Sequence, residues 1–377
     1  MKNNNSLVKG FRDYTEEEAL KRAEIRKILV ETFEKYGFKP TETPIIEDEK
    51  FVRGENSGDE AVSDIYKLKD KGKRSLGLRY EFTFQLKRLM KNKKLPFRRY
   101  QIGEVFRDEP VSSNRFRQFT QCDIDIVGST IKDEAEILRI IKEVLDNLGI
   151  KFVIYFNNRK LLNEILNEQR IKKANEVIRE IDKLDKLKES EVRNNLKKYN
   201  AQNVLEIFRK PEAYFKKYNS YKEIDELKKY CKFYGVSVRF FPSLARGLSY
   251  YNGSVFEVKT KTAKESICAG GSYVVNNKQS TGISFGLDRL SNLAKIKLNK
   301  DKTMVLSINQ DREAIKLANR LRKSGESVIL FYGKPSKALE FANSKKISRV
   351  IFVGEKEVKE GKFKVKDMVS GRETVLQ

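Results

Sequence analysis

The chain of 377 residues contains no histidine, and this absence excludes several kinds of chemistry. Without an imidazole the chain cannot form a Ser-His-Asp or Cys-His triad, and it cannot form a helical His-Glu-x-x-His zinc site. Acid–base steps that depend on a histidine side chain are excluded for the same reason. Any reaction that this protein catalyses must therefore use other groups.

Cysteine and long apolar runs are also scarce. The three cysteines, Cys122, Cys231 and Cys268, lie far apart and form no C-x-x-C pair. Their spacing indicates neither a disulfide framework nor a zinc knuckle, and a reducing cytoplasm fits it best. No apolar run is long enough to span a membrane, and the polar segment 1–6 lacks the apolar core of a signal peptide. We therefore expect a cytoplasmic protein with no membrane partner.

Positive charge, in contrast, is abundant. The chain has 78 Lys and Arg residues against 53 Asp and Glu residues, which gives a formal net charge of +25 at pH 7. Cationic side chains that neutralise phosphates release counterions, and this favours polyanionic partners such as nucleic acid. A lysine-rich bias shared by all proteins of the source would give the same excess. Composition alone leaves both explanations open.

Hydrophobic periodicity predicts the elements of the first 150 residues. Thr15 and Glu18 have the spacing of a capping box, and apolar residues then recur at helical intervals as far as Phe33. A polar, Gly-containing stretch follows at 54–58. Beyond it the pattern predicts a strand at 64–68, a helix at 84–90, two extended segments at 100–107 and 116–127, and a helix at 132–148. The two extended segments flank a short loop around Pro110 and 112–114, so we expect an antiparallel hairpin, because parallel strands need a long crossover.

The second half of the chain changes character twice. From about 159 to 234 the composition becomes rich in Lys, Glu, Asn and Leu at helical spacing. These charges are either solvated helix faces or the surface of an inserted helical module that rests on a polyanion, and the pattern does not decide between them. Strands are expected at 236–241, 254–259 and 282–285. Strand and helix then alternate at 304–308, 312–323, 327–332, 338–343 and 349–353, which predicts a separate small α/β domain that begins after the lysine-rich segment 295–302.

The turn of the hairpin carries side chains suited to binding a nucleotide. Guanidinium groups bind phosphate oxygens, aromatic faces stack on purines, and carboxylates hold the magnesium ion of a nucleoside triphosphate. A solvated, salt-bridged hairpin edge is the alternative. The residues concerned are Arg107, Arg115, Arg117, Phe106, Phe116, Phe119, Glu104 and Glu109.

The hairpin also resembles the second signature motif of class II aminoacyl-tRNA synthetases. The resemblance lies in 106–109 (FRDE), 115–119 (RFRQF) and 121–125 (QCDID). The particular residues are similar to those of histidyl-tRNA synthetases of the archaeal and eukaryotic kind. Further stretches agree with that family, in order along almost the whole chain: 9–14 (KGFRDY), 78–83 (LRYEFT), 244–251 (LARGLSYY), 282–290 (GISFGLDRL), and the ending 353–367, which resembles the family's anticodon-binding domain.

The resemblance implies an α+β fold, with the antiparallel sheet of class II synthetases flanked by helices. It places the catalytic domain in 1–160 and 236–298, a helical insertion in 161–235, and a C-terminal α/β anticodon-binding domain in 303–377. It further implies a homodimer that takes L-histidine, ATP with Mg²⁺ and tRNA(His) as substrates and uses no zinc. The expected reaction forms histidyl-adenylate and then transfers the histidyl group to the 3′ end of the tRNA.

Two other functions stay open at this point. A catalytically weak paralogue would bind histidine or tRNA as a regulator, although regulatory relatives usually lack the C-terminal domain and the segment at 246–251, both of which are present. A generic basic RNA-binding protein would bind tRNA without regard to its identity.

The resemblance assigns the histidine site residue by residue. It sets the α-ammonium against Glu81, Thr83 and Gln121, and the imidazole between Asp125 and a pair of tyrosines. Imidazole offers one donor and one acceptor, so a carboxylate and a phenol on opposite sides read both nitrogens and reject apolar isosteres. The full histidine-binding set is Glu81, Phe82, Thr83, Arg107, Gln121, Asp125, Arg246, Tyr250 and Tyr251.

The resemblance assigns the ATP site in the same way. Arg107 and Arg246 approach the α-phosphate from two sides, and Arg289 binds the triphosphate. Guanidinium groups stabilise the negative charge that gathers as the substrate carboxylate attacks, and no enzyme base is needed because the carboxylate is already ionised. The catalytic set is Arg107, Arg246 and Arg289. The ATP-binding set is Arg107, Glu109 at the adenine edge or metal shell, Arg115 at the γ-phosphate, Phe119 stacked on adenine, and Arg289.

Each residue has a simpler explanation when it is taken alone. Arg79 and Glu81 would form a surface ion pair, the tyrosines would be ordinary strand packing, and Asp288 with Arg289 would be a helix-end salt bridge. The chain also departs from the family pattern. It has Ser249 where the family usually has Asp, and Thr120 where many members have His. Gly-Gly-Ser-Tyr-Val at 270–274 replaces Gly-Gly-Arg-Tyr-Asp.

Overall fold

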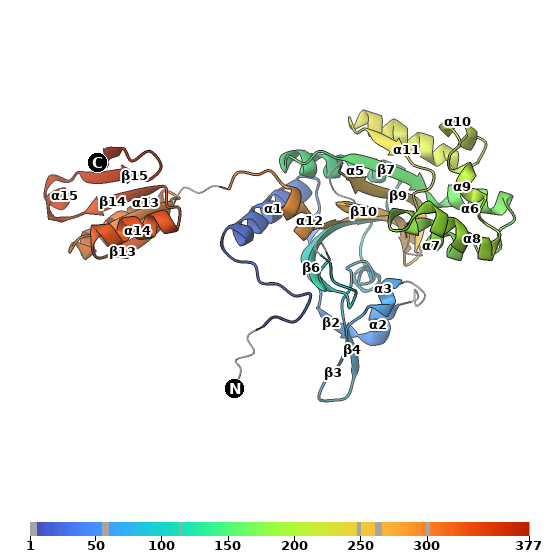
Figure 1. The fold of residues 1–377 in the computed structure, drawn as a ribbon, viewed down its shortest axis with the longest axis horizontal. Coiled ribbons are helices and arrows are strands. Elements are labelled where there is room, and N and C mark those ends of the chain that lie inside the picture. Colours follow the sequence, from blue (N-terminus) through green and yellow to red (C-terminus); the bar gives the residue numbers. More distant parts are fainter. Residues whose placement is uncertain are drawn as a thin grey trace. The chain divides into compact units, whose positions relative to one another are not determined.

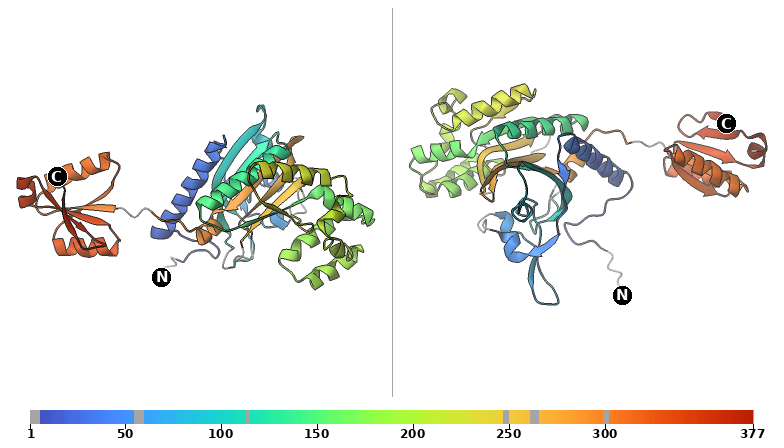
Figure 2. Two further views of the ribbon diagram at one scale, coloured as in Figure 1. Left: turned by 90° about the horizontal axis from the view of Figure 1, so that it is seen from above. Right: turned by 180° about the vertical axis from the view of Figure 1, so that it is seen from behind.

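The computed structural model describes residues 6–54, 60–112, 115–246, 250–260, 266–298 and 302–376. The chain divides into two compact units, Met1–Ile296 and Lys297–Gln377. Figures 1 and 2 show the elements of each unit. Within the described ranges, no helix is long and apolar enough to cross a membrane.

An eight-stranded sheet organises the first unit (Figure 1). The strand order is β1-β5-β6-β11-β10-β9-β7-β8. The neighbouring long strands pair antiparallel, whereas the edge pairs β1–β5 and β7–β8 are parallel. The strands are β1 (Lys39–Pro40), β5 (Phe97–Phe106), β6 (Gln118–Val127), β7 (Val153–Asn158), β8 (Val238–Phe240), β9 (Tyr251–Lys259), β10 (Cys268–Val275) and β11 (Lys278–Gly286).

The antiparallel hairpin predicted from the sequence is confirmed as β5 and β6. Successive side chains of a strand point to opposite faces of the sheet. On β6 one set enters the hydrophobic core and consists of Cys122, Ile124 and Ile126. The opposite set consists of Gln121, Asp123 and Asp125. Two polar side chains of the predicted site, Gln121 and Asp125, are therefore aligned on one face together with Asp123.

Helices α1 (Glu16–Lys35), α5 (Ile131–Asn147) and α12 (Leu287–Leu293) pack around the core on the apolar side of β6. The first two confirm the helices predicted there. The capping box predicted for α1 is wrong: Thr15 stands at the N-cap without a side-chain capping bond. Glu18 instead accepts a hydrogen bond from Arg12 at 2.7 Å.

A three-stranded sheet lies on the other side of the large sheet (Figure 1). It consists of β2 (Ile46–Asp48), β3 (Lys67–Lys69) and β4 (Ser75–Leu78), with the short helices α2 (Glu49–Arg53), α3 (Glu60–Ser63) and α4 (Leu86–Leu89) nearby. The predicted strand at 64–68 begins only at Lys67, and the helix predicted at 84–90 is shorter than expected. Two predicted segments fall outside the described residues. They are most of the stretch at 54–58, and Ser113 and Asn114 of the hairpin loop.

The segment from 159 to 234 is helical, as predicted. Leu161, Val177 and Leu196 belong to the same buried apolar cluster as Phe256 of the sheet, so these helices share the core of the first unit. They are α6 (Arg159–Glu168), α7 (Ala174–Asp182), α8 (Glu189–Leu196), α9 (Val204–Ile207), α10 (Glu212–Phe215) and α11 (Tyr221–Phe233), with 3₁₀ turns at Lys183–Asp185 and Lys197–Tyr199.

Three strands of the large sheet, β1, β7 and β10, were not predicted. In β10 the pair Gly270 and Gly271 interrupts the alternating pattern that marks a strand. The structure requires these glycines, because a Cβ on Gly270 would lie 2.0 Å from the Gly282 carbonyl oxygen of β11. The register also shifts between Gly271 and Tyr273.

The second unit is a five-stranded sheet of order β13-β12-β14-β15-β16. The alternation predicted from the sequence is confirmed, and apolar clusters cover both faces of the sheet. A final antiparallel hairpin extends it. The elements are β12 (Lys302–Ser307), α13 (Asp311–Lys323), β13 (Ser327–Tyr332), α14 (Pro335–Ser344), β14 (Arg349–Val353), α15 (Glu355–Glu360), β15 (Phe363–Asp367) and β16 (Glu373–Leu376).

Candidate active site

The polar face of β6 contains a buried carboxylate, Asp125, that three strands surround. The side chain of Asp125 is 3% exposed. The Tyr273 hydroxyl of β10 donates a hydrogen bond to Oδ1, and the Arg99 guanidinium of β5 places Nη2 2.8 Å from Oδ2. On β11 the residue opposite is Gly282, where a Cβ would lie 2.2 Å from Oδ1. The glycine therefore makes the room that the carboxylate occupies.

A second carboxyl, Asp123, lies two residues away on the same face. Burial, and then the charge of Asp125, raise the pKa of Asp123 to about 8, although Arg99 opposes this shift. Burial also raises the pKa of Asp125, whereas Arg99 and the Tyr273 hydroxyl lower it. Arg99 and the Tyr273 hydroxyl therefore favour the ionised form of Asp125, whereas burial and the charge of Asp125 favour the protonated form of Asp123.

Three tyrosine rings stand beside these carboxyls. The ring centroid of Tyr250 is 4.7 Å from that of Tyr251 and 5.6 Å from that of Tyr273. The Tyr250 hydroxyl lies 3.5 Å from a carboxylate oxygen of Glu81. Burial first, and then nearby carboxylates, raise the pKa of Tyr250 and Tyr273 well above the usual value. The phenols therefore stay protonated and act as hydrogen-bond donors.

Among the other residues predicted to bind histidine, Gln121 donates to the Ser284 hydroxyl at 2.6 Å, and its own carbonyl oxygen is buried with no hydrogen-bond partner within the described part of the chain. Thr83 is half-buried in the segment after Glu81. Phe82 has no exposed surface, and its ring lies under the Arg79 guanidinium. Its backbone carbonyl accepts a hydrogen bond from Arg99 at 3.1 Å.

The arginines predicted to bind ATP fall into two groups. At the hairpin end, the Arg107 guanidinium lies over the Phe119 ring at 5.2 Å, and its Nε donates to the Tyr80 carbonyl at 3.2 Å. Arg115 forms an ion pair with Glu109 at 3.4 Å. Cation and aromatic side chains of this kind, close together at the end of the sheet, suit a phosphate and a purine.

The second group, Arg246 and Arg289, is linked through Ser266, which precedes β10, and Glu257 of β9. Arg246 forms an ion pair with Glu257 at 3.4 Å, and its Nε is buried with no hydrogen-bond partner in the described ranges. Arg289 donates to the Ser266 carbonyl at 2.6 Å, and the Ser266 hydroxyl donates to Glu257. Arg246 also lies close enough to Tyr251 to lower its pKa, although burial raises that pKa more. Arg246 thus connects this corner with the tyrosine cluster.

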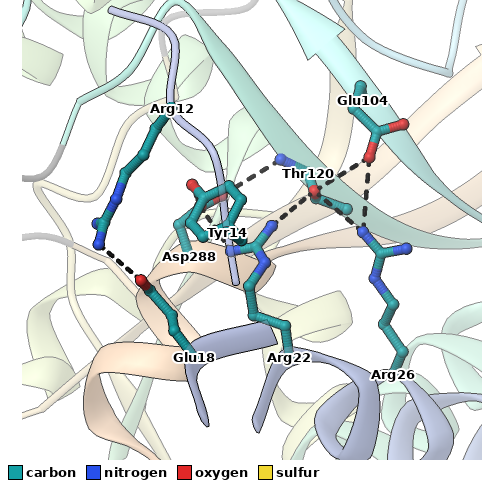
Figure 3. A network of polar contacts seen from close by, with 8 residues as sticks. All are labelled: Arg12, Tyr14, Glu18, Arg22, Arg26, Glu104, Thr120 and Asp288. Atoms are coloured by element: carbon teal, nitrogen blue, oxygen red, sulfur yellow. Dashed lines mark hydrogen bonds and ion pairs between the residues drawn. The ribbon is translucent and has the colours of Figure 1, made fainter. Parts of the chain in front are cut away.

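A network on the opposite face of β6 supports the start of α12 (Figure 3). Asp288 accepts hydrogen bonds from the Tyr14 hydroxyl at 2.5 Å, from Arg22 at 2.7 Å and from the backbone of Thr120 at 3.2 Å. Burial, and then the hydrogen bond to Asp288, raise the pKa of Tyr14 to about 12. Asp288 is therefore paired with Arg22, and not with Arg289 as the helix-end alternative required.

A cavity of about 240 Å³ adjoins this network, between the N-terminal half of α1 and the ends of β5 and β6. Its wall includes Arg12, Tyr14, Arg26, Glu104 and Phe119. The cavity lies on the α1 side of the sheet, whereas the carboxyl and tyrosine cluster lies on the other side. The cavity is thus separate from the carboxyl and tyrosine cluster, although Phe119 of the predicted ATP site forms part of its wall.

Several residues of the site were missed by sequence reasoning. Arg99 is a charged residue inside a buried strand, and Asp123 repeats Asp125 at the two-residue period of a strand, so both carried a signal. Tyr273 carried a signal only through its place in the stretch 270–274, and Glu257 carried none, because only the pairing of distant strands brings them to the site. Arg79 is buried and donates to the carbonyls of Glu104 and Thr43 at 2.8 Å, which excludes the surface ion pair with Glu81.

The departures from the family pattern lie in different surroundings. Thr120 accepts a hydrogen bond from Arg22 at 3.0 Å, and Val274 is 43% exposed. Ser272 is fully buried and donates to Glu134 of α5. Ser249 lies outside the described residues. Nowhere in the described ranges do three or more carboxylate or thiolate side chains form a group able to hold a metal ion.

Comparisons with known proteins agree with this geometry. Residues 10–290 match the family model described as histidyl-tRNA synthetase, and residues 302–376 match the model described as an anticodon binding domain. A histidine–tRNA ligase of Bacillus cereus is 34% identical over 409 residues, which cover 97% of this chain and 96% of that protein. The histidine–tRNA ligase of Methanocaldococcus jannaschii is 32% identical over 410 residues, which cover 98% and 96%. Bacterial and archaeal relatives are thus about equally similar.

Solved structures show the same fold. The crystal structure of histidyl-tRNA synthetase from Nostoc sp. aligns with a TM-score of 0.85 at 25% identity and covers 99% of this chain and 97% of that one. A Bacillus halodurans structure, described as an ATP phosphoribosyltransferase regulatory subunit/histidyl-tRNA synthetase, aligns with a TM-score of 0.77 over 93% of this chain and 98% of that one. At 23% identity that likeness shows the fold alone. The predicted α+β class is confirmed.

Proposed function

Because the chain belongs to the histidyl-tRNA synthetase family, we propose that it is a histidine–tRNA ligase. It activates L-histidine with ATP to histidyl-adenylate, releases pyrophosphate, and transfers the histidyl group to the 3′ end of tRNA(His). The observation that carries this proposal is the buried group of a carboxylate and protonated phenols around Asp125. Such a group offers an acceptor and donors at once, which is what the two nitrogens of a neutral imidazole require.

Histidine binds with its imidazole between Asp125 and the tyrosines. The ring N–H donates to the carboxylate, and a phenol donates to the other nitrogen. The α-ammonium lies near Glu81, Thr83 and Gln121, whose free carbonyl oxygen accepts from it. An apolar side chain of similar shape would leave these buried polar groups unpaired, so the pocket rejects it.

The activation step uses the arginines on both sides of the site. The ionised carboxylate of histidine attacks the α-phosphorus of ATP, and Arg107, Arg246 and Arg289 stabilise the charge that develops. Phe119 offers its face to the adenine and Arg115 its charge to the γ-phosphate. The substrate supplies the nucleophile in its reactive state, which explains how a chain without histidine can run this reaction.

ATP enters as its magnesium complex. Glu109 is half-buried at the hairpin end, close enough to Arg115 for an ion pair, and a carboxylate there suits the outer ligand shell of an ion carried by the triphosphate. The triphosphate itself provides most ligands of the ion, because nucleotide-bound Mg²⁺ usually takes one or two carboxylates together with phosphate oxygens and waters.

The domains are proposed to divide the recognition of tRNA. Residues 1–160 and 236–298 form the catalytic domain, 161–235 the helical insertion that touches the acceptor arm, and 303–377 the domain that reads the anticodon, in line with the match at 302–376. Two copies of the chain form the working homodimer in the cytoplasm. The net charge of +25 then has a polyanionic partner.

Histidine-dependent exchange of pyrophosphate into ATP tests the proposal, followed by aminoacylation of a panel of purified tRNAs. We expect exchange that depends on histidine, and charging of tRNA(His) alone. Binding of histidine and ATP with no exchange would support the regulatory paralogue, which the ligase relatives do not favour. Charging that ignores tRNA identity would contradict the assignment.

A further inference from the structure

Arg99 is the largest fully buried side chain of the chain's described part, and it lies beneath the polar face of the sheet. Its Nη2 is 2.8 Å from Asp125 Oδ2, its Nη1 donates to Gln101 Oε1 at 3.0 Å, and its Nη2 also donates to the Phe82 carbonyl at 3.1 Å. Gln101 in turn donates to the Thr43 hydroxyl at 2.7 Å. The guanidinium is thus held in one position by contacts from three segments.

We propose that Arg99 is a positioning and specificity-determining residue, which holds the Asp125 carboxylate ionised and in one orientation so that it reads the ring N–H of histidine. The inference rests on the proposed histidine–tRNA ligase activity. Arg99 itself does not touch the substrate, since it has no exposed surface.

The hydrogen-bond capacity of Asp125 supports this role. A carboxylate has about four acceptor sites. One oxygen accepts from Tyr273 and the other is in contact with Arg99, so sites remain for an imidazole N–H. With these two partners on opposite oxygens the carboxylate cannot rotate without losing one of them. The missing side chain at Gly282 leaves room for the carboxylate, because a Cβ there would lie 2.2 Å from Oδ1.

The energetics point away from a purely structural role. A buried ion pair contributes little net stability compared with apolar residues of the same volume, because both ions lose their hydration. An apolar pair would therefore serve the fold at least as well. Removal of Arg99 alone, however, leaves Asp125 buried without a counter-charge, and such a group takes up a proton. A protonated Asp125 presents a hydroxyl in place of a full negative charge and accepts from the imidazole N–H less strongly.

The other groups that face Asp125 do not replace Arg99. From β10 comes the neutral phenol of Tyr273, from β6 itself the Asp123 carboxyl, and from β11 only Gly282. Glu81 adds a further negative charge near Asp123. Arg99 is thus the cation that balances this cluster within the described residues, and its loss should make the binding of histidine sensitive to pH.

The test compares Arg99→Met, Arg99→Lys and the matched control Arg98→Met in the full-length protein. Arg98 is the neighbouring residue on the same strand, but its side chain binds Asp133 at 3.0 Å and Glu136 of α5. The KM values for histidine and for ATP are measured by pyrophosphate exchange between about pH 6.5 and about pH 8.5. The ionisation of free histidine affects all proteins equally, so the ratio of variant to wild-type KM is compared.

We expect Arg99→Met to raise the histidine KM roughly 10- to 100-fold near neutral pH, the range found when a residue that orients a metal ligand is lost. The ATP KM should change by less than about threefold, and the histidine ratio should fall as pH rises, because Asp125 regains its charge. Arg99→Lys should restore part of the affinity and most of the pH independence, and Arg98→Met should leave the histidine KM unchanged.

A double variant tests whether Arg99 affects histidine binding through Asp125. In an Asp125→Asn background, Arg99→Met should add less than about threefold to the histidine KM, because two residues that act through one another are not additive. Three results would each overturn the inference. The first is an equal loss of histidine and ATP affinity in Arg99→Lys, and the second is a ratio of Arg99→Met to wild-type histidine KM that does not change with pH. The third is an additive effect of Arg99→Met and Asp125→Asn on the histidine KM. Wild-type protein without histidine-dependent exchange would overturn the proposed function itself, and a normal wild type with an unaffected Arg99→Met would overturn the inference alone.

Discussion

Glu134 is a buried carboxyl whose charge should make the stability of the first unit depend on pH. It lies on α5, is 4% exposed, and accepts a hydrogen bond from the Ser272 hydroxyl. Its Oε2 has no hydrogen-bond partner in the described ranges. The family usually has arginine where this chain has Ser272, and an arginine there would have supplied a counter-charge. Replacement of Glu134 by Gln keeps the shape and the hydrogen bond but removes the charge.

The magnitude follows from the pKa of Glu134. Burial raises it from 4.5 to about 7, although the hydroxyls of Ser254 and Ser272 act in the opposite direction. At about 1.4 kcal/mol per pKa unit, the difference amounts to about 3 kcal/mol. Because the folded-state pKa is the higher one, the wild type has its full stability below about pH 4.5 and loses it progressively up to about pH 7. The Gln variant does not titrate there.

Urea unfolding followed by circular dichroism measures this effect, since the chain contains no tryptophan to report by fluorescence. The free energy of unfolding of Glu134→Gln minus that of the wild type should rise by about 3 kcal/mol as the pH is raised from about 4.5 to about 8. The control is Glu226→Gln on α11, an exposed position, where we expect no pH-dependent gain. The reasoning would be refuted if Glu134→Gln gained the same free energy of unfolding at about pH 4.5 as at about pH 8. It would also be refuted if the variant lost free energy of unfolding relative to the wild type and this loss grew with pH.

Three further predictions concern the site. Arg246→Ala should lower the rate of pyrophosphate exchange on the order of a hundredfold or more while the fold, followed by circular dichroism, stays intact; an unchanged rate would refute its phosphate role. Asp125→Ala should raise the histidine KM far more than the ATP KM, and a loss of ATP binding alone would move Asp125 out of the histidine pocket. Gly282→Ala should also weaken histidine binding, since its Cβ would lie 2.2 Å from Asp125 Oδ1. The matched change Gly72→Ala, whose Cβ would lie no closer than 3.4 Å to the Asp70 side chain, should leave the histidine KM as it is.

The sequence by itself determined the parts of this protein that depend on neighbouring residues. The hairpin of β5 and β6 could be predicted because a short loop joins two alternating segments, and short-range pairing needs no information from elsewhere. The helices of α1 and α5 and the alternation of the second unit follow from periodicity in the same way. The family signatures are also contiguous stretches, so the sequence alone was enough to name candidate residues for histidine and ATP.

Only the tertiary structure decided which groups share a buried environment. Asp125 meets Tyr273 because β6 and β10 both pair with β11, which contributes only a glycine between them. Arg99 is fully buried, and desolvation raises the pKa of Asp123 and of Glu134; both effects depend on what the whole fold packs around a group. A local sequence pattern does not determine that environment. The charge balance of the site therefore follows only from the folded structure.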